Sequence, residues 1–170
     1  EKLPAAPDLI CFRYNPGPRR TGNAIIGNPV EAKFGLRGDQ LADAYRRARD
    51  LGVRRFGLHS MIVSNERDYR QMVLTTQMLL ELVEQLEQEL DIAFEFINIG
   101  GGLGIPYRPD DVPLDLPGLG REISTLFDGF LERKGRAPKL GSESGRYMTG
   151  PHGVLVTRVI NRKQAYLTYI

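Results

Sequence analysis

Short strand-like segments alternate along this chain with longer segments whose apolar residues recur at helical spacing. Four segments have the length and the flanking turn residues expected of strands: 9–14, 55–59, 94–99 and 139–143. Three longer segments carry an apolar residue every three or four positions and are predicted to be helices: 38–51, 68–90 and 121–134. Because each strand after the first follows a helix, the pattern predicts an α/β fold with a parallel sheet.

The helical spacing also predicts which side chains face the core. The first helix would bury Leu41, Ala44, Tyr45, Ala48 and Leu51. The second would bury Met72, Thr76, Leu79, Leu80, Val83, Leu86 and Leu90. The third would bury Ile123, Leu126, Phe127 and Phe130. Among the strands, 94–99 is apolar enough to predict burial on both faces, and Cys11 in the first strand is expected to be a small buried side chain.

Two further segments do not fit the strand and helix alternation. The segment 107–117 is rich in proline, which is typical of a loop rather than a helix. The segment 153–160 is β-like but has no helix before it, so it indicates a change of architecture near residue 150.

Polar residues and glycines gather where each predicted strand ends. Arg13 and Asn15 end the first strand, His59 and Ser64 follow the second, and 100–102 and 143–146 follow the others. In parallel sheets the loops after the carboxyl ends of the strands carry the chemistry. The four clusters are therefore expected to form one site.

The segment Gly100-Gly-Gly102 is the most distinctive of these clusters. Consecutive glycines allow close backbone approach and positive φ, so that successive N–H groups can converge on an anion such as a phosphate. No Lys-Ser/Thr pair follows, as a Walker loop would require, and the dinucleotide-binding spacing of glycines is absent. A phosphate site and a simple tight turn both remain open on spacing alone.

Composition narrows the possible classes of protein. The chain has 170 residues and a formal net charge of +2 with acids and bases interspersed, so neither a nucleic-acid partner nor a membrane surface is indicated. No apolar run approaches the roughly 20 residues of a membrane span. The single cysteine excludes an internal disulfide framework and favours a reducing, cytoplasmic location. We expect no metal site.

Five motifs, taken in order, resemble a known family. They are Phe12-Arg-Tyr-Asn-Pro-Gly17, Ala32-Lys-Phe-Gly-Leu36, Gly57-Leu-His-Ser-Met-Ile-Val-Ser64, Asn98-Ile-Gly-Gly-Gly-Leu-Gly-Ile-Pro-Tyr107 and Glu143-Ser-Gly-Arg146. The chain resembles the pyridoxal 5'-phosphate (PLP) barrel of the alanine-racemase-like decarboxylases, and most of all the diaminopimelate decarboxylases. It departs from their pattern at Asn98 (Asp in the family), Ser144 (Pro) and Met61 (the second of two histidines).

The resemblance implies a fold and a domain division. Residues 1–150 would supply strands five to eight of a PLP-binding TIM (β/α)8 barrel, and 151–170 would begin a C-terminal β-domain with its first strand. The lysine that forms the Schiff base with PLP belongs to the family's first strand. None of the five lysines, Lys2, Lys33, Lys134, Lys139 and Lys163, has its aromatic-Ala-x-Lys-Ala-Asn context. The chain by itself is therefore expected to be inactive.

The resemblance also assigns roles to residues of the predicted site. It assigns the phosphate of PLP to Ser64, Gly100, Gly101, Gly102 and Gly145. Glu143 would keep the pyridine nitrogen protonated and so act in catalysis. His59 and Met61 match the two histidine positions beside the cofactor, and the second histidine stacks on its ring. Arg146 would pair with a distal carboxylate of the substrate.

The implied activity is decarboxylation of an amino acid with PLP as cofactor. The substrate would be meso-diaminopimelate, which yields L-lysine and CO2, and the full-length protein would be a homodimer. Arginine, ornithine or carboxynorspermidine decarboxylases are alternatives within the same class. Two other classes stay open: a non-catalytic PLP-binding protein on the same barrel, and an unrelated open α/β phosphate-binding module.

Overall fold

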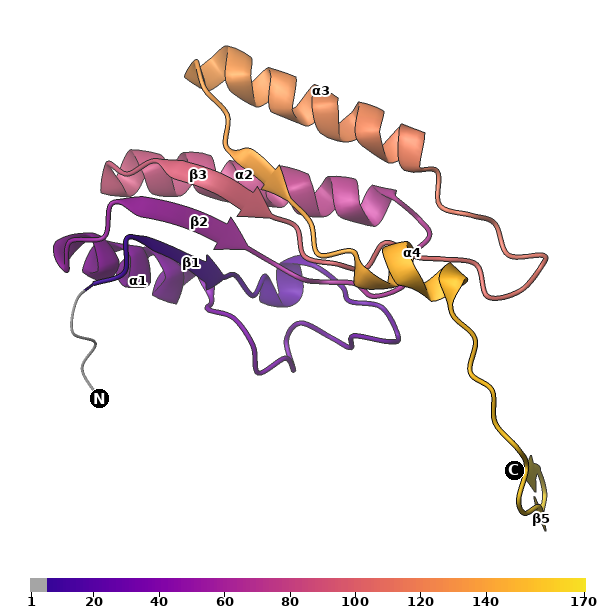
Figure 1. The fold of residues 1–170 in the computed structure, drawn as a ribbon. Helices are drawn as coiled ribbons and strands as arrows, with labels where there is room; N and C mark the ends of the chain where they lie inside the picture. The colour runs from indigo at the N-terminus through magenta and orange to yellow at the C-terminus, as the bar shows by residue number, and fades with distance from the viewer. Residues whose placement is uncertain (1–5) are drawn as a thin grey trace.

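A sheet of four parallel strands forms the centre of the molecule (Figure 1). The computed structural model describes residues 6–170, so Lys2 lies outside it. The strands pair in chain order and are β1 (Leu9–Arg13), β2 (Arg55–His59), β3 (Phe94–Asn98) and β4 (Lys139–Gly141). The predicted parallel sheet is confirmed.

Three helices connect successive strands, and Figure 1 shows them along one side of the sheet. They are α1 (Gly38–Asp50), α2 (Arg70–Leu90) and α3 (Leu116–Lys134). All seven apolar-face positions predicted for α2 are buried. In α1 the predicted core residue Leu51 is instead 74% exposed, because the helix ends at Asp50 and Leu51 is its C-cap. In α3, Ile123 and Phe130 are buried, whereas Leu126 and Phe127 are partly buried.

Helix α3 begins five residues earlier than predicted, at Leu116 rather than Arg121. Pro117 lies in its first turn, where a missing backbone N–H costs no intrahelical hydrogen bond. The side chain of Asp115 accepts a hydrogen bond from the Gly118 N–H and caps the helix. The prediction of a loop up to Pro117 was wrong because proline is tolerated at this one helical position.

Tyr45 of α1 ties the helical layer to the sheet. Its ring centroid lies 5.0 Å from those of Phe12 and Phe94 in edge-on geometry. The Tyr45 hydroxyl donates to the Gly57 carbonyl at 2.5 Å and accepts from the Phe12 N–H at 3.4 Å. Burial raises the pKa of this hydroxyl, so it stays protonated. One side chain thus contacts β1, β2 and β3.

The face of the sheet away from the helices is open in the described chain. On β3 the buried residues Phe94 and Ile97 pack in the core, while Glu95 is exposed and Phe96 is half-buried. The prediction that 94–99 is buried on both faces was therefore wrong. Cys11, which is in register with Gly57 and near Phe96, is exposed rather than buried for the same reason.

The chain beyond residue 144 leaves the sheet. A short helix α4 (Gly145–Thr149) and a 3₁₀ turn, Gly150–His152, lead into an exposed extended segment that ends in the pair β5 (Lys163–Gln164) and β6 (Thr168–Tyr169) (Figure 1). The strand predicted at 153–160 is absent from the structure, because no other part of residues 6–170 pairs with its backbone. Within the described chain no helix is both long and apolar enough to cross a membrane.

We predict that Tyr45→Phe lowers the free energy of unfolding by about 1–3 kcal/mol, because the buried Gly57 carbonyl loses its hydrogen-bond donor. Urea unfolding of the protein measures this change. Tyr107→Phe is the matched control, since that ring is 68% exposed, and we expect a change within about 0.5 kcal/mol. Equal effects of the two substitutions would show that the buried hydroxyl does not stabilise the sheet.

Candidate functional site

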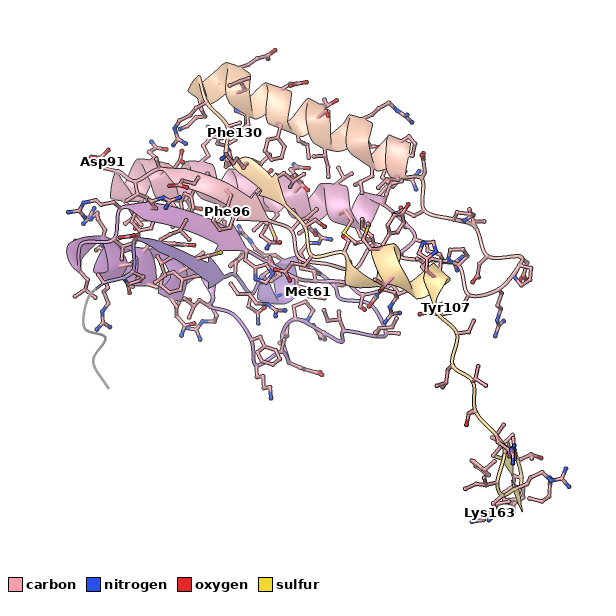
Figure 2. The ribbon with its side chains drawn as sticks, in the orientation of Figure 1. Met61, Asp91, Phe96, Tyr107, Phe130 and Lys163 are labelled. Atoms are coloured by element: carbon pink, nitrogen blue, oxygen red, sulfur yellow. The ribbon has the colours of Figure 1, made fainter. Side chains whose placement is uncertain are left out.

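The carboxyl ends of the four strands meet at one end of the sheet. The register aligns Arg13 with His59, His59 with Asn98, and Asn98 with Gly141. Figure 2 shows Met61 and Tyr107 at this end, and Asp91 at the opposite end. We call the cluster at the carboxyl ends the strand-end site; it comprises Arg13, His59, Met61, Asn98, 100–102 and Glu143, and Ser64 and 144–146 lie at its margin.

The glycine turn 100–102 has no room for side chains. Gly100 and Gly102 adopt φ of +74° and +105°, in the left-handed region that favours glycine. A Cβ atom on Gly101 would lie 2.6 Å from the Glu143 carbonyl oxygen, and one on Gly100 would lie 2.7 Å from the Ser60 carbonyl oxygen. A Cβ on Gly102 would collide with the Val63 carbonyl. The turn is thus packed between the loops that follow β2 and β4.

Two amides of the turn have no acceptor within residues 6–170. The Gly100 N–H donates to Asn98 Oδ1 at 2.8 Å. Within residues 6–170 the N–H groups of Gly101 and Gly102 donate to no protein acceptor, and Gly101 is buried. Buried N–H groups are almost always paired, so two free donors in a tight turn suit a phosphate.

Glu143 is held beside this turn by its backbone and by its side chain. Its N–H donates to the Gly100 carbonyl at 2.9 Å, and its Oε1 accepts from Asn98 Nδ2 at 2.8 Å. The side chain remains 55% exposed. Glu143 therefore presents a carboxylate of defined orientation on the open face of the sheet.

His59 approaches the same oxygen of that carboxylate. Its Nε2 is 3.9 Å from Glu143 Oε1 and is buried without a hydrogen-bond partner in the described chain. Burial lowers the pKa of His59 from its ordinary value; the Glu143 charge opposes this shift, and the nearby Arg13 adds to it. The neutral imidazole is therefore favoured.

Met61 covers the glycine turn from the side of β2. Its methyl group lies 3.8 Å from the point where a Cβ on Gly101 would be. The Met61 carbonyl accepts from the Arg13 guanidinium at 3.0 Å, and Arg13 lies 5.5 Å from the centre of the Phe34 ring. Beside Met61, a cavity of about 130 Å³ extends between the end of β1 and Phe34. An apolar wall thus stands next to the amides of Gly101 and Gly102.

The remaining predicted site residues lie at the margin. The Ser64 hydroxyl has no hydrogen-bond partner among residues 6–170, while its carbonyl accepts from Asn23 Nδ2 at 2.6 Å. The Gly145 N–H donates to the Glu143 carbonyl at 3.0 Å, so it is already paired. Arg146 on α4 is exposed and lies 6.0 Å from the centre of the Tyr107 ring. The structure therefore brings His59, Met61, the glycine turn and Glu143 together, with Arg146 outside them.

The sequence interpretation missed two members of the site. Asn98 was noted only as a departure from a family motif, and Arg13 only as a strand-end residue. Both residues end a predicted strand just before a turn, and this position could have indicated that they belong to the site. Only the strand register shows that both side chains reach the same cluster. The described residues contain no group of three or more His, Cys, Asp and Glu side chains arranged to hold a metal ion.

Comparison with known proteins identifies similar chains. Residues 7–150 match the family described as pyridoxal-dependent decarboxylase, pyridoxal binding domain. Protein TabA of Pseudomonas amygdali pv. tabaci is 41% identical over 162 residues, which is 95% of this chain and 38% of TabA. Diaminopimelate decarboxylase of Methanothermobacter thermautotrophicus is 36% identical over 160 residues, 92% of this chain and 37% of that enzyme.

A solved structure shows the same fold. Diaminopimelate decarboxylase from Helicobacter pylori, complexed with L-lysine, superposes with a TM-score of 0.72 at 21% identity, covering 92% of this chain and 38% of that one. The chain thus spans less than two fifths of the length of each of these relatives.

We predict that Gly101→Ala lowers the free energy of unfolding by about 1–3 kcal/mol, because its methyl group would force the turn away from the Glu143 carbonyl. Gly120→Ala is the control, since that helical glycine has open space around it and alanine there should be neutral or stabilising by up to about 1 kcal/mol. Urea unfolding measures both, and a harmless Gly101→Ala would mean that the turn is not held against the loop after β4.

Proposed function

Because the chain belongs to the family of pyridoxal-dependent decarboxylases, we propose that its strand-end site binds PLP and that the protein decarboxylates an amino acid. The observation that carries this proposal is the pair of free amides at Gly101 and Gly102, one of them buried, beside an oriented carboxylate. PLP has two polar ends. Its phosphate requires N–H donors, and its protonated ring nitrogen requires a carboxylate.

We assign the phosphate of PLP to the glycine turn. The N–H groups of Gly101 and Gly102 are the principal donors, since those of Gly100 and Gly145 are paired within the protein. The free hydroxyl of Ser64 is the proposed side-chain donor. The positive φ at Gly100 and Gly102 turns successive amides toward one side, which is the geometry of an anion-binding nest.

The ring end is assigned to Glu143. When bound, PLP supplies an electron sink for the carbon that loses CO2, and this sink requires a protonated ring nitrogen. A carboxylate that accepts a hydrogen bond from that nitrogen holds the proton in place. Asn98 restricts Glu143 to one orientation, so little rotamer entropy is lost when the contact forms. Met61 would pack its thioether against the ring.

The substrate is proposed to be meso-diaminopimelate. Arg146 is exposed on α4, and a guanidinium recognises a carboxylate with two parallel hydrogen bonds. Diaminopimelate carries a distal carboxylate, which arginine and ornithine lack. The Methanothermobacter relative is named as a diaminopimelate decarboxylase, and the Helicobacter structure holds L-lysine. These names support the proposal.

The whole enzyme is proposed to need more than this chain. We propose that β1–β4 are strands five to eight of the barrel, that 151–170 begin the C-terminal β-domain, and that the full-length enzyme is a cytoplasmic homodimer. No lysine here has the context of the Schiff-base lysine. The chain alone is therefore expected to have no decarboxylase activity.

We predict that Glu143→Gln in the full-length protein lowers kcat by about two orders of magnitude or more, the size typical of removing a group that governs a proton at the reacting centre. Bound PLP, measured by absorbance, should remain close to stoichiometric because the phosphate donors are unchanged. Glu95→Gln is the control, since Glu95 is exposed and pairs with Arg55. Wild-type turnover in Glu143→Gln would contradict the assignment.

We also predict that Arg146→Lys lowers kcat/KM about ten- to hundredfold, because lysine keeps the charge but loses the paired hydrogen bonds to a carboxylate. PLP affinity should not change. Arg121→Lys on α3, where the side chain is exposed, is the control. If excess PLP restores the rate of Arg146→Lys, Arg146 binds the phosphate and the substrate assignment fails.

A further inference from the structure

Two side chains converge on the same oxygen of Glu143. His59 and Asn98 are register partners on β2 and β3, so their side chains stand next to each other on the open face of the sheet. Asn98 Nδ2 lies 2.8 Å from Glu143 Oε1, and His59 Nε2 lies 3.9 Å from the same atom. In residues 6–170 no hydrogen bond or ion pair reaches Glu143 Oε2.

Gly141, the adjacent position on β4, has no side chain that could block the approach of Glu143 to Asn98. Gly141 is the register partner of Asn98, and a Cβ atom there would lie 3.7 Å from Asn98 Cβ and Cγ. Glu143, two residues further on, can therefore bend back over β4 and reach the Asn98 amide. Its own N–H, bonded to the Gly100 carbonyl, anchors the backbone of this bend.

Asn98 makes two hydrogen bonds that only an amide can combine. Its Oδ1 accepts from the Gly100 N–H at 2.8 Å, while its Nδ2 donates to Glu143. An amide side chain has both an acceptor and donors, whereas an ionised carboxylate only accepts. Aspartate at this position would keep the bond to the glycine turn and lose the bond to Glu143.

His59 has an unused nitrogen directed at Glu143. Its Nε2 is buried and has no hydrogen-bond partner in the described chain, which is uncommon for a buried polar atom. The charged and titratable groups around it are Arg13 and Cys11 on β1 and Glu143 after β4. A small rotation of the exposed Glu143 side chain would close the 3.9 Å gap to a hydrogen bond.

We propose that Asn98 and His59 are positioning residues that hold Glu143 by Oε1 and so reserve Oε2 for the ring nitrogen of PLP. The role of Oε2 toward the ring nitrogen rests on the proposed function. The positioning of Glu143 by Asn98 and His59 concerns only residues of this chain and holds with or without the cofactor. The two claims are therefore tested separately.

The first experiment titrates His59 by NMR in the full-length protein without added PLP, its signal being assigned by loss in His59→Gln. The charge of Glu143 raises the pKa of His59 in the folded protein. Glu143→Gln should therefore lower the pKa of His59, because the protonated imidazole no longer faces a negative charge. Glu95→Gln should leave it unchanged. An unchanged pKa in Glu143→Gln would overturn the pairing.

The second experiment substitutes Asn98→Asp in the PLP-loaded full-length enzyme. The glycine turn keeps its cap, but Glu143 loses a donor and gains a neighbouring carboxylate. Two carboxylates so close resist ionising together, so the acid limb of the kcat profile should move to higher pH by about one unit. Bound PLP should persist. Asn161→Asp, in the exposed tail, is the control. An unshifted profile would overturn the role of Asn98.

The two readouts separate the inference from the proposed function. Coupling between His59 and Glu143 in a protein that decarboxylates no amino acid would overturn the proposed function and support the positioning of Glu143. Normal decarboxylation without coupling would overturn the positioning and leave the proposed function in place. Should His59→Gln not fold, the Asn98→Asp profile still decides whether a donor at position 98 positions Glu143.

Discussion

The turn after β3 brings three chain segments into contact with no side chain between them. Gly100 approaches the Ser60 carbonyl, Gly101 approaches the Glu143 carbonyl and Gly102 approaches the Val63 carbonyl. Any Cβ at these positions would separate the loops that follow β2, β3 and β4. The position of Glu143, the orientation of the Gly101 and Gly102 amides and the approach of Met61 all depend on this close backbone contact. The same glycines that allow the packing therefore also provide the amides that we propose bind a phosphate.

The remainder of the fold holds that turn in place. Tyr45 connects α1 to three strands through its ring and its hydroxyl, and the sheet register aligns the carboxyl ends at one level. Parallel strands present all their carboxyl ends at the same edge, so residues more than a hundred positions apart become neighbours. Arg13 and Glu143 reach the same cluster for this reason.

Two of the departures that the sequence resemblance implies, Met61 and Asn98, fall beside Glu143 and the glycine turn. Met61, where the resemblance implies a histidine, offers a polarisable but uncharged surface over the turn. Asn98, where the resemblance implies an aspartate, provides the donor that an aspartate lacks. Neither side chain ionises, and the ionisable groups that residues 6–170 bring close to Glu143 include His59 and Cys11.

The sequence by itself determined the alternation of strands and helices and the parallel sheet, because periodicity is a local property. It predicted 100–102 from their glycine content, and Glu143 from the family resemblance, as site residues. It also predicted the core face of α2, where an uninterrupted helix repeats its pattern over 21 residues. Three expectations needed tertiary context and were wrong: the burial of Cys11, the burial of both faces of β3, and a strand at 153–160. Exposure and strand pairing depend on which other segments lie alongside, which local sequence does not encode. For the same reason, only the tertiary structure showed that Asn98 and His59 meet at one oxygen of Glu143.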